Sequence, residues 1–176
     1  MMTLAGAPTL RTERLILRLP KASDFEAWAD CMGSDRARFI GGPIERHLAW
    51  RSFCHLGGHW MMRGYGMFVF ADPATDVPFG MTGPWFPEGW PEQELGWTVW
   101  DAGVEGKGLA REAALAARDF AYGTLGWTTA ISLIDPGNAR SIALATRLGC
   151  VFERDYTHPQ FGAMQIWRHP VAEALA

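Results

Sequence analysis

The sequence predicts a mixed α/β protein with a mainly antiparallel sheet of about six to seven strands, flanked by about four helices. Leucine occupies alternate positions of residues 15–19, which is the pattern of a strand, and Pro20 ends it. Apolar segments on either side of residues 72–76 predict a hairpin. A later helix that begins near Leu109 carries small residues on one face, so it can lie close against a sheet.

Two helices are expected between the first strand and the hairpin. Ser23, with Glu26 three residues later, has the spacing of a capping box and predicts the first helix. From Glu45 to Arg63, apolar residues recur at mostly helical spacing and predict the second. Gly57 and Gly58 lie inside this second helix and can break or kink it.

The remaining elements are expected in the order hairpin, strand, helix, strand, helix and two final strands. Their residues are 67–70 and 77–85 for the hairpin, 94–100, 109–126, 129–133, 139–148, 151–155 and 164–168. Trp85, Phe86 and Trp90 lie in a loop rich in proline and glycine, where large apolar side chains are expected to cover a ligand or partner.

Length and composition predict a single domain over residues 1–176, because 48% apolar residues can bury one sizeable core but the chain is short for two. A net charge of -3 gives no electrostatic case for binding nucleic acid. The N-terminus lacks the features of a signal peptide, and no apolar run approaches transmembrane length. We therefore expect a soluble, unprocessed cytoplasmic protein, either monomer or homodimer.

The cysteines and histidines do not predict a metal site. The chain has three cysteines, Cys31, Cys54 and Cys150, and no two of them form a C-x-x-C pair. An odd number without such a pair predicts reduced and mostly buried thiols. His55 and His59 are four residues apart on a predicted helix, but glycines separate them and no carboxylate is near in sequence. A surface or packing role is expected for both.

The segment from Glu94 to Ala114 joins a strand, a glycine-rich turn and the start of a helix. Gly106 and Gly108 allow a tight turn whose N–H groups point at an anion beside a helix N-terminus, which predicts a pyrophosphate site. A dinucleotide fingerprint would need glycine in place of Arg111. A Walker A loop would need Ser or Thr in place of Gly108.

This turn resembles the acetyl-CoA pyrophosphate loop of the GCN5-related N-acetyltransferases (GNAT), which follows the pattern Gln/Arg-x-x-Gly-x-Gly/Ala. Gly108 and Ala110 fit it, and Glu105 departs from it by placing a negative charge at the Gln/Arg position. The resemblance implies acetyl-CoA as the acetyl donor. It implies binding by residues Glu105, Gly106, Lys107, Gly108, Leu109, Ala110 and Arg111.

Two further segments strengthen the resemblance. Residues 10–18 are similar to the opening strand of the RimJ/RimL branch of this family, and residues 138–141, with 147–149, are similar to the helix beside the pantetheine arm. All three segments occur in family order and frame nearly the whole chain. They imply a GNAT fold and an N-acetyltransferase.

Glu94 is the candidate general base, because its position in the strand lets it face a cleft and its spacing from Gly108 resembles that of the family's glutamate. A solvent-facing glutamate at a strand start is the alternative. The resemblance also implies a backbone N–H near Thr98 or Val99 that binds the thioester carbonyl. Asn138 resembles the asparagine that holds the pantetheine arm, and it is equally suited to cap a helix.

The general acid is less defined, because Ala145 occupies the position where many members have tyrosine. Ser141 matches the serine of the RimJ/RimL branch and could donate to the departing sulfur, although a helix-surface serine is the alternative. Tyr156 is the fallback. We expect direct transfer of acetyl to a primary amine in a ternary complex, with a protein or peptide N-terminus as acceptor. The alternatives are a small-molecule amine, or a catalytically weak acyl-CoA sensor.

Overall fold

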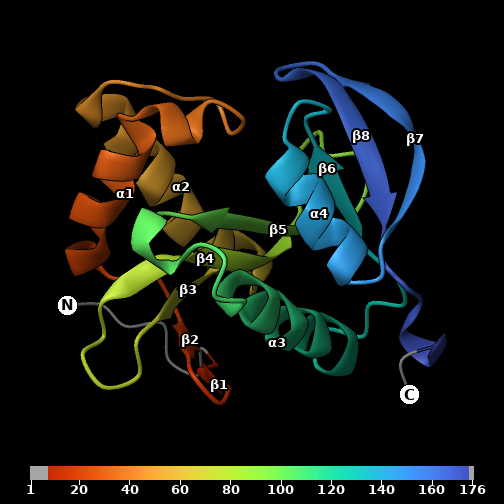
Figure 1. Ribbon diagram of the computed structural model, residues 1–176, viewed down its shortest axis with the longest axis horizontal. Helices are drawn as coiled ribbons and strands as arrows, with labels where there is room; N and C mark the ends of the chain where they lie inside the picture. Colours follow the sequence, from red (N-terminus) through yellow and green to blue (C-terminus); the bar gives the residue numbers. More distant parts are fainter. Residues whose placement is uncertain (1–7, 175–176) are drawn as a thin grey trace.

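The computed structural model describes residues 8–174, which form an eight-stranded sheet and four α-helices (Figure 1). The strands are β1 (Leu10–Arg11), β2 (Ile16–Arg18), β3 (Phe68–Ala71), β4 (Pro78–Trp85), β5 (Glu94–Val99), β6 (Ile131–Ile134), β7 (Val151–His158) and β8 (Gly162–Arg168). The helices are α1 (Phe25–Met32), α2 (Arg46–Arg63), α3 (Leu109–Gly123) and α4 (Ala139–Arg147). The mixed α/β fold is confirmed.

The strands lie in the order β1-β2-β3-β4-β5-β6-β8-β7, and neighbouring strands are antiparallel except β5 and β6, which are parallel. The first five therefore pair in chain order. The chain returns to β6 through α3, because a parallel pair needs a crossover. This crossover places the turn before α3 at the end of β5.

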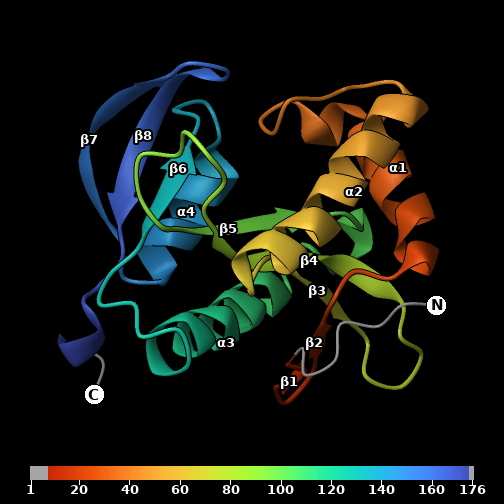
Figure 2. The same cartoon turned by 180° about the vertical axis from the view of Figure 1, so that it is seen from behind.

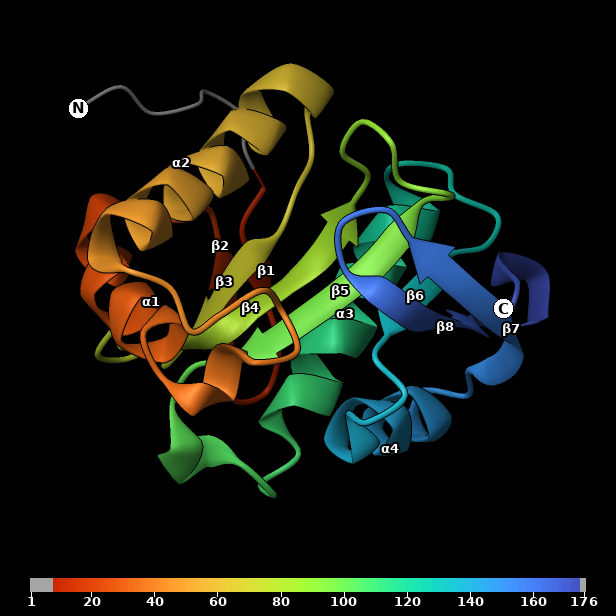
Figure 3. The same ribbon diagram turned by 90° about the horizontal axis from the view of Figure 1, so that it is seen from above.

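Helices cover both faces of the sheet: α1 and α2 lie on one face, and α3 and α4 on the other (Figure 3). Alternate residues of a strand point to opposite faces, so Val69 packs with α1 and α2 whereas Phe68 and Phe70 pack with α3. The small-residue face of α3 includes Ala113 and Ala117, both fully buried. Their size lets α3 approach the sheet closely, as the sequence predicted.

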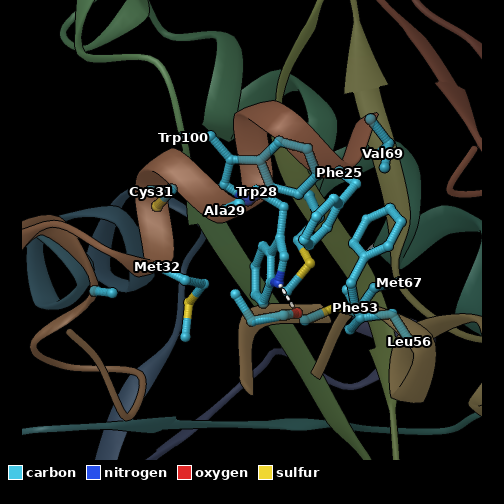
Figure 4. Close-up of a cluster of buried hydrophobic side chains, with 13 residues drawn as sticks. Phe25, Trp28, Ala29, Cys31, Met32, Phe53, Leu56, Met67, Val69 and Trp100 are labelled. Carbon is cyan, nitrogen blue, oxygen red and sulfur yellow. Dashed lines mark hydrogen bonds between the residues drawn. The ribbon is translucent and has the colours of Figure 1, made fainter. Parts of the chain in front are cut away.

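The core under α1 and α2 is built from aromatic and sulfur-containing side chains (Figure 4). Trp28 lies at its centre, with its ring 5.6 Å from Trp100 and 6.4 Å from Phe53 between centroids. Its indole N–H donates to the Ala49 carbonyl of α2 at 3.0 Å, so the buried polar atom has a partner. This bond ties α1 to α2.

The structure differs from the sequence-based elements in a few places. It adds β1, whose two residues are too few to show a periodic pattern. In the final hairpin, β7 ends later than expected, at His158, and β8 begins earlier, at Gly162. Helix α2 runs through Gly57 and Gly58 without a break. Added Cβ atoms at these glycines would meet no neighbour within 4 Å, so the surface position tolerates them.

The predicted capping box at Ser23 and Glu26 is wrong. Ser23 lies inside a short 3₁₀ helix (Ala22–Asp24), and Asp24 occupies the N-cap position of α1. Asp24 is buried, accepts from the Lys21 N–H at 2.7 Å and pairs with Arg18 at 2.8 Å. A buried carboxylate requires such partners, and this requirement outweighs the local spacing.

The thiols and helices of the described residues carry little functional information. Cys31 and Cys150 are buried and Cys54 is exposed, and all three are free. Within residues 8–174, none of the helices combines the length and apolar composition needed to cross a bilayer.

Candidate active site

The parallel strands β5 and β6 share one registered position, Glu94 with Ile131. There the Ile131 N–H donates to the Gln93 carbonyl at 2.9 Å. The described chain holds no further paired position between these strands, so they separate beyond this point. Figure 1 shows the two halves of the sheet diverging from this end of β5.

The open edge of β5 presents backbone groups of alternate residues. The Trp100 N–H donates to the Phe79 carbonyl of β4 at 2.8 Å. Alternation then turns the Thr98 N–H toward β4 and the Val99 N–H toward the separated side. Of the two predicted thioester-binding positions, only Val99 has its N–H on the open edge, where its carbonyl accepts from Arg36 Nη2 at 2.9 Å.

Glu94 lies at the point where the strands separate, and only 7% of its surface is exposed. The Leu133 N–H of β6 donates to Oε1 at 3.0 Å, and the Trp90 indole N–H donates to Oε2. The side chain is therefore buried and fixed at both oxygens, which contradicts the solvent-facing alternative.

Burial raises the pKa of Glu94 from 4.5 to about 7, and the hydrogen bonds from Trp90 and Leu133 only partly oppose this rise. Neither donor carries a charge, so the ionised carboxylate has no cation to offset its lost hydration. A carboxyl group with this pKa exchanges protons near neutral pH, as a general base must.

The turn before α3 has the backbone geometry predicted from its glycines. Gly106 and Gly108 have φ values of +74° and +78°, a region that side chains other than glycine disfavour. Within residues 8–174, the N–H groups of residues 106–111 have no protein acceptor. Six consecutive free donors at a helix N-terminus are suited to bind an anion. This set includes the backbone of Lys107, Leu109, Ala110 and Arg111.

The first-strand motif contacts this turn. Glu112, in the first turn of α3, accepts from Thr12 Oγ1 at 2.5 Å and from the Arg14 N–H at 2.9 Å. Arg14 Nη1 also donates to the Lys107 carbonyl at 2.9 Å. A trans peptide directs its C=O and the next N–H in opposite directions, so holding this carbonyl turns the Gly108 N–H away from Arg14.

Glu105 does not leave an isolated negative charge at the turn. Its carboxylate pairs with Arg36 at 2.6 Å and with Arg140, at the start of α4, at 3.0 Å. The two guanidinium groups come from segments on either side of the separated strands, and together they offset the charge that the sequence placed near the phosphates.

The start of α4 faces β5 through Ser141. Asn138 is the N-cap of the helix, and its Oδ1 accepts from the Ser141 N–H at 3.2 Å. The Ser141 Oγ accepts from the Trp97 indole N–H of β5 at 3.2 Å. Because the hydroxyl oxygen already accepts one bond, its own proton is free to point elsewhere.

A family model described as the acetyltransferase (GNAT) domain matches residues 14–151. The chain belongs to the GNAT family of acetyltransferases. It is similar to the crystal structure of an acetyltransferase from Agrobacterium tumefaciens, with 35% sequence identity and a TM-score of 0.85. That match covers 97% of this chain and 98% of the other.

More distant GNAT structures share the fold. A putative ribosomal-protein-serine acetyltransferase from Vibrio cholerae is 21% identical, with a TM-score of 0.73 over 93% of this chain and 98% of that one. RimL, a ribosomal L7/L12 α-N-protein acetyltransferase solved in complex with coenzyme A, is 15% identical. Its TM-score is 0.72 over 92% of this chain and 97% of that one. Acetyl-CoA is the acyl donor of the GNAT family.

This acetyltransferase has an aromatic group beside Glu94 that sequence reasoning found only in part. The loop from 86 to 93 reaches the β7–β8 hairpin (Figure 2), where the Trp90 ring lies 4.7 Å from His158 and 6.0 Å from Phe161 between centroids. The sequence singled out Trp90 as a cover, but gave no sign of its bond to Glu94. Tyr156 contacts His158 edge to face, so it belongs to this group.

The other candidates from the sequence have structural roles. His59 uses both ring nitrogens on the backbone, at Tyr65 and Phe86, and stacks on Trp85 at 4.4 Å. Trp85 thus covers protein and not a ligand. Burial raises the pKa of the Cys150 thiol to about 12, which makes it a poor nucleophile. No group of three or more metal-ligating side chains exists among residues 8–174.

Proposed function

We propose that this GNAT enzyme transfers the acetyl group of acetyl-CoA to a primary amine by direct attack, with both substrates bound together. The observation that carries the proposal is Glu94, a buried carboxylate with a pKa of about 7 at the point where β5 and β6 separate. Its environment suits a base that must gain and lose one proton in each cycle.

In this proposal, Glu94 removes a proton from the acceptor ammonium, directly or through a water molecule, and becomes a neutral carboxylic acid. The amine nitrogen then bonds to the thioester carbon. The Val99 N–H donates to the oxyanion that develops, which its position on the open edge of β5 supports. The carbon–sulfur bond then breaks and the nitrogen loses its second proton to solvent, so that the products are a neutral amide and a thiolate.

The free N–H groups of residues 106–111 hold the pyrophosphate of CoA, and the side-chain amide of Asn138 binds the pantetheine arm. Ser141 donates its hydroxyl proton to the departing sulfur and regains one from solvent. Its bond from Trp97 supports this role, because it orients the oxygen toward β5. Tyr156 is the weaker candidate, since it contacts the aromatic group around His158.

The proposed acceptor is a protein or peptide N-terminus. An α-amino group has a pKa of about 8 and a lysine-like amine about 10.4. Glu94, with a pKa of about 7, is better matched to the α-amino group. The branch resemblance of residues 10–18 and the ribosomal-protein acetyltransferases among the similar folds support the same acceptor.

Thiol release from acetyl-CoA tests the proposal, with an α-amino peptide, a polyamine and a lysine analogue as acceptors. We expect the peptide to react fastest. Release with none of these amines would favour the sensor alternative. Of the two observations behind that alternative, the absent tyrosine at Ala145 remains, whereas Arg36 and Arg140 offset the Glu105 charge.

Glu94→Gln tests the base separately. Turnover should fall by about 100-fold or more, the usual scale for a positioned base, while CoA affinity measured by calorimetry stays the same. Glu88→Gln, a fully exposed change in the adjoining loop, is the matched control and should keep full turnover. Equal turnover of the Glu94→Gln enzyme at all pH values would exclude Glu94 as the base.

A further inference from the structure

The separation of β5 and β6 begins at a definable backbone bond. In a parallel ladder, bonds recur every second residue along each strand. Since the Ile131 N–H donates to the Gln93 carbonyl, the Leu133 N–H should next donate to the Leu95 carbonyl. Within the described residues, β5 and β6 are not paired at Leu95 and Leu133. The bond between the Leu133 N–H and the Leu95 carbonyl is therefore the first ladder bond that fails to form.

Side chains occupy both groups that would have made this bond. The Leu133 N–H donates to Glu94 Oε1 at 3.0 Å. The Leu95 carbonyl accepts from Ser132 Oγ at 2.6 Å. Glu94 and Ser132 thus replace one ladder bond with two side-chain bonds, and the buried backbone groups remain satisfied while the strands part.

The Ser132 hydroxyl also contacts His169, which follows β8. Its Nε2 lies 3.0 Å from Ser132 Oγ, and its residue is only 2% exposed. Burial lowers the pKa of His169 to about 3, so the ring is neutral. Because the Ser132 hydroxyl donates to Leu95, its oxygen accepts from His169 Nε2–H.

We propose that Ser132, oriented by His169, is a positioning residue that acts with Glu94 to hold β5 and β6 apart for the acyl thioester. The inference rests on the proposed function, in which the donor substrate lies along the open edge of β5. Without the hydroxyl, the buried Leu95 carbonyl loses its donor, and the Leu133 N–H is the donor nearest in register. The strands then pair one position further, at the expense of the substrate site and of the Leu133 bond to Glu94.

Ser132→Ala tests this role through CoA affinity, which needs no chemistry. We expect calorimetry to show binding about tenfold weaker, the effect of one hydrogen bond of ordinary net strength. Thr82→Val is the matched control. Thr82 is also buried, and its hydroxyl donates to the Gly96 carbonyl of β5 at 2.9 Å, but on the intact β4 side. Its CoA affinity should stay within about twofold of the original.

Ser132→Thr keeps the hydroxyl and should restore the affinity. If Ser132→Ala does not fold, His169→Phe removes only the orienting donor and should weaken CoA binding in the same direction, to a smaller extent. Unchanged affinity in these variants, or an equal loss in Thr82→Val, would overturn the proposal.

The pH profile separates this inference from the assignment of Glu94. In Ser132→Ala, Glu94 loses the Leu133 donor, so the apparent pKa that governs kcat/KM should rise. Within residues 8–174, Glu94 itself bonds only to the uncharged donors of Trp90 and Leu133. Of the titratable side chains on the surrounding elements, Glu92 pairs with Arg168, His158 packs against the Trp90 ring, and His169 contacts Ser132. Weaker CoA binding with an unshifted profile would support the role of Ser132 and exclude Glu94 as the base.

Discussion

Glu94 and Glu105 bracket β5 and the segment after it, and their surroundings are opposite. Glu94 is buried and bonded by two neutral donors, an indole and a backbone N–H. The Glu105 side chain is 31% exposed and pairs with the guanidinium groups of Arg36 and Arg140. One carboxylate has lost its hydration without gaining a cation, and the other has gained two.

The difference shows that the surroundings of a glutamate determine whether its carboxyl group can exchange protons near neutral pH or serves as an ion-pair partner. Without a cation, burial brings the pKa of Glu94 to about 7, where a proton can be taken and returned. With two cations, Glu105 serves as an ion-pair partner that connects Arg36 to the start of α4. The base end of the site should therefore control turnover, and the turn end should control CoA affinity.

The largest expected effect lies at the turn end. Gly108→Val would force a β-branched side chain into a φ of +78° and misdirect the donors of the anion site. Because each charge-assisted bond is worth about 1.5 to 3 kcal/mol, loss of two should weaken CoA binding by at least about 100-fold. Calorimetry on the folded variant measures it.

Gly57→Ala is the control for a glycine substitution. An added Cβ meets no neighbour within 4 Å at this helix position, so the variant should gain about 0.5 to 1 kcal/mol of stability and keep its CoA affinity. Undiminished CoA affinity in Gly108→Val would move the phosphate site away from this turn.

The base end can be tested through stability alone. The folded pKa of Glu94 lies above its ordinary value, so the folded state binds the proton more tightly than the unfolded state does. The stability that the Glu94 proton contributes is therefore fully present below about pH 4.5. This contribution is lost as the pH rises from 4.5 to about 7. The loss should be on the order of 3 kcal/mol.

Urea unfolding at pH 5 and pH 8 measures this loss as a difference between the original protein and Glu94→Gln. The pH dependence should be weaker in the variant. An identical dependence in both proteins would mean that Glu94 is ionised throughout this range.

A smaller effect is expected at Ser141. Ser141→Ala should slow the single-turnover rate by less than about tenfold, since a thiolate leaves readily and water can replace the hydroxyl. Tyr156→Phe on the same peptide acceptor is the comparison. A loss in Tyr156→Phe alone would transfer the acid role to Tyr156, and no loss in either would assign protonation to solvent.

The smallest effect tests whether the Glu105 charge is offset. Glu105→Gln introduces the residue of the family pattern and should tighten CoA binding by no more than about fivefold, because partly exposed ion pairs contribute little. Titrations at low and high salt measure it. Tightening well beyond tenfold would show that Arg36 and Arg140 leave the charge largely uncompensated.

Patterns that depend on neighbouring residues could be predicted from the sequence. The glycine spacing at Gly106 and Gly108 predicted a turn with free N–H groups, because backbone conformation is set locally. The alternation in residues 94–100 placed Glu94 opposite to Leu95, because side chains alternate along any strand. The local capping rule at Ser23 did not hold, since the buried Asp24 and Arg18 pair took precedence.

The sequence by itself determined the fold class, the family resemblance and the position of the glycine turn with its free N–H groups. Only the tertiary structure decided the pKa of Glu94, the pairing of Glu105 with Arg36 and Arg140, and the capping of Leu95 by Ser132. The physical reason is that desolvation and hydrogen bonding depend on atoms within a few ångströms, and the chain brings these atoms together from distant segments. Local spacing fixes which groups a strand or turn presents, and packing fixes what those groups meet.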